Sequence, residues 1–126
     1  MKKLTILLFS ILISFNSYGE WAELAQNGEG DTFYIDADTI RENGGYVYYW
    51  ELIDLIQPDE WGDMSVKIYI QGDCLVNRFI FLSSMTYKQS MGGGSGETMS
   101  PPDEWQYPVP ESVDAHLLDE VCRYVD

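Results

Sequence analysis

Two strand-like segments within residues 33–55, separated by a turn at residues 41–45, constrain the fold more than any other part of the sequence. The first segment alternates Phe and Ile with other side chains, and the second is rich in the aromatic and β-branched residues that favour strands. Asn43-Gly44 supplies the positive φ angles that a tight hairpin turn needs. The sequence therefore predicts a β-hairpin whose second strand lies centrally in a sheet.

Further strand patterns lie on both sides of this hairpin, at residues 20–25, 65–71 and 75–87. In residues 65–71, Val66, Ile68 and Ile70 alternate with polar or amphipathic side chains. This alternation predicts a half-buried strand with those three residues facing the core. A turn is expected at residues 72–73, and the glycine-rich residues 91–103 are expected to form a flexible surface loop.

One helix is expected near the C-terminal end of the sequence. Ser112 is a suitable N-cap, and Asp114 in the first turn favours the positive end of the helix dipole. The apolar side chains that follow form one stripe at helical spacing: Val113, Leu117, Leu118, Val121, Cys122 and Val125. The predicted fold class is therefore α+β: a small, meander-like antiparallel sheet of four to six strands with one C-terminal helix packed on it.

The first 19 residues have the pattern of a secretory signal peptide. Two lysines precede residues 4–15, an uncharged apolar run of 12 residues, and Ser17 and Gly19 provide a small-residue cleavage site. The alternative is a transmembrane anchor, which would need about 20 apolar residues, and this run is too short. We therefore expect a signal peptide that is cleaved after Gly19. We expect a signal peptide at residues 1–19 and one exported domain at residues 20–126, in the periplasm or secreted. The sequence has no cysteine near the cleavage site to which a lipid anchor could be attached.

The predicted mature chain is strongly acidic. Residues 20–126 contain 5 basic and 21 acidic residues, a net charge of −16. Nucleic acids and anionic membrane surfaces bind clustered Lys and Arg, so this charge argues against both as partners. It favours a basic protein partner, or it serves solubility alone. A chain of this length forms one domain with a single modest core.

The sequence has two cysteines, Cys74 and Cys122. In an exported protein they indicate one disulfide, which would contribute about 4 kcal/mol by closing a long loop. The alternatives are a metal pair or a catalytic thiol. Neither finds support, because the sequence has no CxxC motif and its only histidine is His116.

No residue pattern predicts catalytic residues, a cofactor or metal ligands. His116 lies beside the apolar helical stripe, with neither a serine nor a free cysteine close by in sequence. Two carboxylate clusters do not match a calcium-binding loop: Asp36 with Asp38, and Asp59 with Glu60 and Asp63. A phosphate loop needs a strand before its glycines, a helix after them and usually a lysine, whereas Glu97 and prolines follow the glycine run at residues 92–94. The nine tyrosines and four tryptophans either form a sugar or peptide platform or fill the core and strand faces.

An ordered series of short motifs runs through residues 20–126. In order, they are Trp21; Tyr34-Ile35-Asp36 with Asp38-Thr39-Ile40; Trp50 with Leu52-Ile53-Asp54; Ser65-Val66-Lys67; Asp73-Cys74; Tyr87; Met91-Gly92-Gly93-Gly94; Trp105; Pro110 with Ser112; and Leu117-Leu118 with Val121-Cys122. In this order the chain resembles the bacterial surface-adhesin protein E family. The resemblance implies a small antiparallel sheet with a C-terminal helix, with the two cysteines bonded. It also implies binding to host extracellular proteins, because the named family members are surface proteins that do so.

Three functional hypotheses follow. The first is an exported, non-catalytic protein-binding domain of the adhesin E type, with an extracellular or basic protein as its partner. The second is a periplasmic acidic inhibitor, or other binding partner, of a basic enzyme such as a lysozyme. The third is a small hydrolase with dispersed carboxylates, which requires a buried Asp or Glu of raised pKa in a concave site.

Overall fold

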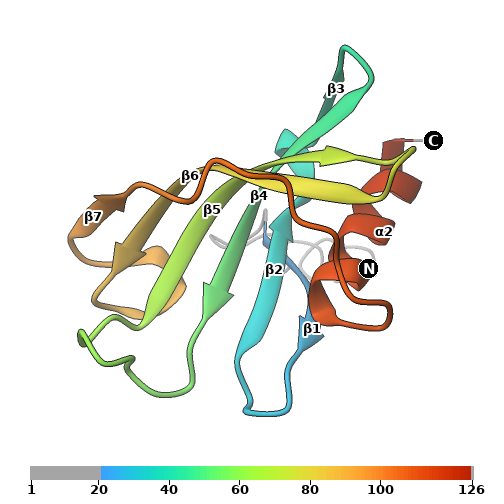
Figure 1. The fold of residues 1–126 in the computed structure, drawn as a ribbon. Coiled ribbons are helices and arrows are strands. Elements are labelled where there is room, and N and C mark those ends of the chain that lie inside the picture. The colour runs from blue at the N-terminus through green and yellow to red at the C-terminus, as the bar shows by residue number, and fades with distance from the viewer. Residues whose placement is uncertain (1–20, 126) are drawn as a thin grey trace, which may run out of the picture.

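A computed structural model describes residues 21–125 as one antiparallel β-sheet with one α-helix on one of its faces (Figure 1). The seven strands are β1 (Trp21–Gln26), β2 (Thr32–Asp36), β3 (Arg41–Asn43), β4 (Tyr46–Asp54), β5 (Ser65–Asp73), β6 (Arg78–Tyr87) and β7 (Gly96–Met99), and the helix is α2 (Val113–Val125). Their order across the sheet is β1-β2-β4-β5-β6-β7, and β3 also pairs with β4. The predicted α+β fold is confirmed. The predicted signal peptide lies outside the described residues.

The hairpin predicted around Asn43 forms, but its turn lies one residue later than expected. Asn43 pairs with Tyr46, so the two turn residues are Gly44 and Gly45. Both have the positive φ, +63° and +90°, that this type of turn requires. The second glycine displaces the turn because glycine adopts positive φ at less cost than asparagine does. The resulting hairpin of β3 and β4 projects from the body of the molecule (Figure 1).

The first arm of the hairpin is divided by a 3₁₀ turn, η2 (Ala37–Thr39). The Asp36 Oδ1 atom accepts a hydrogen bond from the Asp38 backbone N–H at 3.2 Å. Asp side chains commonly form such corners, because they hydrogen-bond backbone N–H groups two residues further on. The corner separates β2 from β3, and both strands pair with β4.

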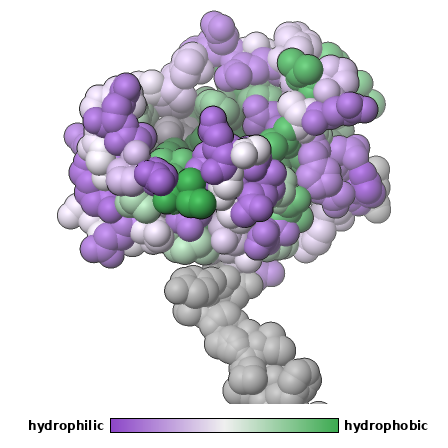
Figure 2. Space-filling model, turned by 90° about the horizontal axis from the view of Figure 1, so that it is seen from below, coloured by the Kyte–Doolittle hydropathy of each residue, from purple (hydrophilic) through white to green (hydrophobic). Residues whose placement is uncertain are grey.

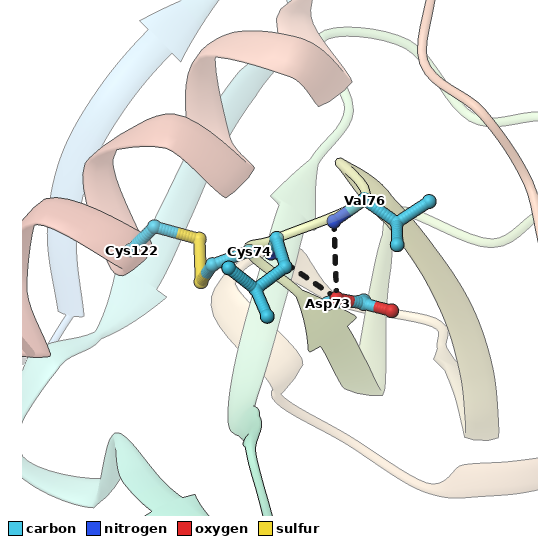
Figure 3. Close-up of a disulfide and its surroundings, with 5 residues drawn as sticks. Asp73, Cys74, Val76 and Cys122 are labelled. Carbon is cyan, nitrogen blue, oxygen red and sulfur yellow. Dashed lines mark hydrogen bonds between the residues drawn. A yellow bond between two sulfur atoms is a disulfide. The ribbon is translucent and has the colours of Figure 1, made fainter.

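The turn predicted at residues 72–73 is wrong, because β5 continues to Asp73 and the chain turns at residues 74–77. The Asp73 Oδ1 atom accepts hydrogen bonds from the backbone N–H groups of Leu75 and Val76, at 3.1 and 3.2 Å (Figure 3). This carboxylate supplies turn hydrogen bonds that the strand pattern alone does not indicate. Consequently β6 begins at Arg78, later than predicted.

The flexible loop predicted at residues 91–103 is also wrong in part. It contains the end of a 3₁₀ turn, η3 (Ser90–Gly92), and the whole of β7, which pairs with β6. The Ser65 hydroxyl connects the turn to β5, since it donates to the Gln89 carbonyl at 2.6 Å and accepts from the Gly92 N–H at 2.8 Å. All four residues of β7 are exposed, so this strand has no burial pattern that its sequence can show.

The core lies between α2 and the sheet. Its buried members are Ile35, Val47, Tyr49, Ile68, Ile70, Phe79, Leu117, Leu118 and Val121. Ile68 and Ile70 are buried there and Val66 packs beside them, which confirms the predicted register of β5. Helix and sheet are close together, because a Cβ atom at Gly72 would lie 2.7 Å from the Leu118 side chain.

The helix is held at both ends of its apolar stripe. At its start, the Ser112 hydroxyl accepts a hydrogen bond from the Ala115 N–H at 3.2 Å, as expected of an N-cap. Near its end, Cys122 is bonded to Cys74 in the turn between β5 and β6, with 5.8 Å between their Cα atoms (Figure 3). No helix within residues 21–125 is long and apolar enough to cross a membrane.

Candidate functional site

The residues considered for catalysis or metal binding lie either in solvent or in turns that their side chains stabilise. His116 is exposed on α2. Asp36 forms the corner described above, and the Asp59 Oδ1 atom accepts hydrogen bonds from the Trp61 and Asp63 N–H groups, both at 2.9 Å. Within residues 21–125, no group of three or more His, Cys, Asp or Glu side chains is arranged to hold a metal ion.

The most distinctive surface is the sheet face opposite α2, here called the aromatic face. Alternation along a strand sends Val47, Tyr49 and Glu51 of β4 to the helix side, so the intervening residues face away from the helix. Six aromatic residues of this face are half-buried, namely Trp21, Tyr34, Tyr46, Tyr48, Trp50 and Tyr69. A seventh, Tyr87, lies opposite Ser65 on β6 and is buried. Within the described residues, α2 is the only α-helix, and it packs on the other face.

The aromatic rings at the centre of this face lie against one another. The Tyr69 ring centroid is 4.8 Å from that of Trp50 and 6.3 Å from that of Tyr48. Trp50 and Tyr69 are directly opposite each other on β4 and β5, which explains the short distance. Such offset, tilted pairs are favourable for aromatic rings and fix their orientation.

Basic side chains accompany the rings. An Arg41 Nη2 group donates a hydrogen bond to the Tyr69 hydroxyl at 2.6 Å. The Lys67 Nζ atom lies 5.9 Å from the ring centroid of Trp21 and 5.6 Å from that of Tyr87, within the range of cation–π attraction. No carboxylate within residues 21–125 forms an ion pair with Arg41 or Lys67.

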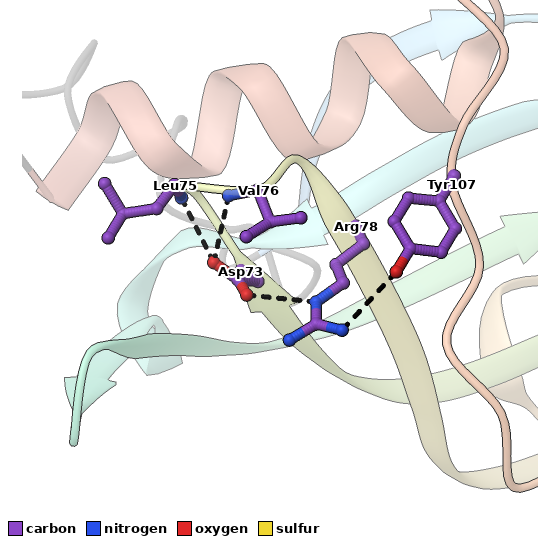
Figure 4. Close-up of polar contacts among 5 residues, drawn as sticks. All are labelled: Asp73, Leu75, Val76, Arg78 and Tyr107. Carbon is purple, nitrogen blue, oxygen red and sulfur yellow. Dashed lines mark hydrogen bonds and ion pairs between the residues drawn. The ribbon is translucent and has the colours of Figure 1, made fainter.

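A third base lies where the face meets the segment that leads to α2. The Arg78 Nε group pairs with Asp73 at 3.0 Å, and its Nη1 group donates to the Tyr107 hydroxyl at 3.4 Å (Figure 4). The guanidinium carbon also lies 4.1 Å from the Trp105 ring centroid. Burial raises the pKa of Asp73, but the hydrogen bonds from Val76, Arg78 and Leu75 outweigh this, so the pKa is below its ordinary value.

Other parts of the surface differ from the aromatic face. Figure 2 shows the end of the molecule that carries the β1–β2 and β4–β5 connections, where hydrophilic residues predominate and apolar patches are small and separate. The five bases within residues 21–125 are outnumbered by carboxylates, yet three of them, Arg41, Lys67 and Arg78, lie on the aromatic face or at its margin. This face therefore combines Tyr, Trp and Arg, the residue types most enriched in protein–protein interfaces.

One buried carboxyl group was not expected from the sequence. Glu51 is 3 % exposed on the helix side of β4, in a space shared with Tyr49, Phe79 and Asp114. Burial, and secondarily the charge of Asp114, raises the pKa of Glu51 from its ordinary value of 4.5 to about 8. The space has no room for a water molecule, so no substrate reaches this group. The hydrolase hypothesis requires a carboxyl group of raised pKa in a concave site. Glu51 has the raised pKa, but it does not lie in a concave site.

The sequence contains a signal for the aromatic face that composition alone does not reveal. Tyr46, Tyr48 and Trp50 occupy alternate positions of one strand, and Tyr69 occupies the matching side of the next. Once the register of β4 with β5 is known, these residues fall on one face. The count of tyrosines and tryptophans does not show this register, so it does not distinguish an aromatic platform from residues of the core and strand faces.

Comparisons with known proteins agree with this architecture. A crystal form of Haemophilus influenzae protein E matches at a TM-score of 0.69 and 15 % identity, covering 90 % of this chain and 96 % of that one. Another structure of the same protein matches at 0.66 and 15 % identity, covering 86 % and 87 %. No curated protein matches the sequence. The model of the surface-adhesin protein E family matches residues 21–123, and the chain therefore belongs to that family.

Proposed function

We propose that this protein is an exported, non-catalytic domain that binds extracellular host proteins, and that the aromatic face is its contact surface. The observation that carries the proposal is the grouping of Trp50, Tyr69, Tyr48 and Arg41 on a sheet face that no α-helix covers among the described residues. Rigid aromatic side chains bring large contact areas at a low cost in conformational entropy. Membership of an adhesin family supports the same function.

The fixed geometry of the face favours binding by preformed contacts. The Arg41–Tyr69 hydrogen bond and the adjacent Trp50 ring restrict each other before a partner arrives. Less side-chain freedom is then lost on association, which strengthens binding for a given contact area. No comparison supports the alternative function, an acidic inhibitor of a basic enzyme.

The test is capture of host proteins by immobilised residues 20–126 from serum and from basement-membrane extract, identified by mass spectrometry. The double variant Trp50→Ala, Tyr69→Ala should reduce the amount captured by about tenfold or more, as expected when central aromatic contacts are removed. Tyr124→Ala is the matched control, because Tyr124 is 60 % exposed on α2 and lies on the other side of the molecule. Its capture should equal that of the unchanged protein.

Two outcomes would count against the proposal separately. Equal capture by the double variant and the control, with both folded by circular dichroism, would remove the aromatic face as the site. Capture of no protein from either source would remove the adhesive function itself. Export is tested independently by intact-mass measurement of the protein recovered outside the cytoplasm, which should begin at Glu20.

A further inference from the structure

A second surface of different character lies at the outer edge of the sheet. β7 is the last strand in the sheet order, and within residues 21–125 no strand pairs with its outer side (Figure 1). Beside it, a cavity of about 390 Å³ opens between β7 and the β4–β5 connection. Its lining includes Trp61, Asp63, Glu97 and Met99. An unpaired strand edge exposes backbone N–H and C=O groups that can accept another extended chain.

The cavity carries an excess of negative charge. Asp59, Asp63 and Glu97 line it, and one base, Lys88, pairs with Asp63 through its Nζ atom at 2.9 Å. The pKa of Lys88 is raised, by its hydrogen bond to Asp63 and, more weakly, by the charges of Asp63, Glu97 and Asp59. Three carboxylates against one ammonium group leave the cavity complementary to an added positive charge.

The cavity also offers apolar contact. Trp61 is 69 % exposed and Met99 is 49 % exposed, an unusual degree of exposure for large apolar side chains. An exposed indole ring beside carboxylates is suited to the long side chain of Lys or Arg, whose stem packs on the ring while its charge meets the acids. Lys88 donates to the Trp61 carbonyl at 3.0 Å, which ties this loop to the end of β6.

We propose that an extended segment of a partner protein pairs with the outer edge of β7 and places a Lys or Arg side chain in this cavity. Backbone pairing supplies affinity in such strand addition, and the pocket for alternate side chains supplies selectivity. This site goes beyond the function proposed above, because it lies on another part of the sheet and does not involve the aromatic face. A second copy of this chain is a poor occupant, since it would bring two acidic cavities together.

The probe for this proposal is the capped octapeptide Ac-TVTKVTVT-NH2, titrated into ¹⁵N-labelled residues 20–126 and followed by amide chemical shifts. Shift changes should centre on residues 96–99 and on the Trp61 indole. Replacing the peptide's Lys by Glu should weaken binding by about tenfold, which corresponds to one reversed charge contact. Methylating alternate backbone nitrogens of the peptide should abolish binding, because the strand-pairing donors are lost.

Matched protein variants separate the site from general electrostatics. Glu97→Lys should weaken the Lys peptide by about tenfold. Glu29→Lys changes the net charge equally but lies in the β1–β2 connection at the far edge of the sheet, and it should leave the affinity unchanged. Trp50→Ala should also leave it unchanged, which keeps this test independent of the aromatic face. The proposal would be overturned if the peptide did not bind, if the Glu peptide bound equally well, or if the shift changes centred elsewhere. It would also be overturned if the protein self-associated through β7 in place of binding the peptide.

Discussion

The buried carboxyl group of Glu51 makes the stability of the domain depend on pH in a direction opposite to that of ordinary carboxylates. In the folded state its pKa is about 8, whereas in the unfolded chain it returns to the ordinary value of 4.5. Between these two pH values the folded state binds one proton that the unfolded state has released. The free energy of unfolding therefore falls as pH rises, and the contribution is fully present below pH 4.5.

The size of the effect follows from the same two values. A shift from 4.5 to about 8, at about 1.4 kcal/mol for each unit of pKa, amounts to about 5 kcal/mol lost by pH 8. This is a large share of the roughly 5–15 kcal/mol that holds a domain of this kind folded. Glu51→Gln removes the titration, because the amide is neutral at every pH. The variant should equal the unchanged protein near pH 4.5 and exceed it by about 5 kcal/mol at pH 8.

Urea unfolding followed by tryptophan fluorescence, at intervals from pH 4.5 to 8.5 and with the disulfide intact, measures this difference. Glu42→Gln is the control, because Glu42 is exposed in β3 and its loss changes the net charge by the same amount. Asp114→Asn should reduce the pH dependence, because the charge of Asp114 is the second cause of the raised pKa of Glu51. A constant offset between Glu51→Gln and the unchanged protein at all pH values would refute the reasoning.

Three further substitutions test how the helix is held. Cys122→Ser should lower the free energy of unfolding by about 2–5 kcal/mol, with hydrogen-exchange protection lost in α2 before the central strands; uniform loss would contradict this. Gly72→Ala should lower the free energy of unfolding by about 1–3 kcal/mol, because the added methyl group would clash with Leu118. In the same urea titration the control Gly28→Ala should change it by no more than about 0.5 kcal/mol, because no atom lies within 4 Å of the added group. Ser112→Ala should cost about 1 kcal/mol and lower helicity by circular dichroism; an unchanged midpoint would show that the cap is dispensable.

The parts of the fold that the sequence predicts are those with a strong periodic signal. Ile68 and Ile70 alternate with polar neighbours, and both lie in the core as expected. The apolar stripe around Leu118 repeats at helical spacing and packs on the sheet. β7 gives no such signal, because all its residues are exposed, and its position depends on pairing with β6. The end of β5 was misplaced because Asp73, a residue typical of turns, is here the last residue of a strand.

The candidate surfaces were less predictable than the fold. The aromatic face depends on the register that sets Trp50 against Tyr69, which is a long-range property of the sheet. The cavity beside β7 depends on a loop that brings Trp61 and Asp63 next to a strand distant in sequence. Glu51 was unexpected because carboxylates are rarely buried, and its strand gives no other sign of the space beneath the helix.

Under the export proposed above, the position of the disulfide has a consequence for how the chain matures. A chain that is secreted N-terminus first delivers Cys74 well before Cys122, which follows it by 48 residues. Successive strands pair with close neighbours in the sequence, so most of the sheet can assemble while the rest of the chain is still arriving. α2 arrives last, and until then the Cys74 thiol remains open to oxidants. We therefore expect mixed disulfides at Cys74 to accumulate when translocation is slowed, and closure of the core to be the final step of maturation.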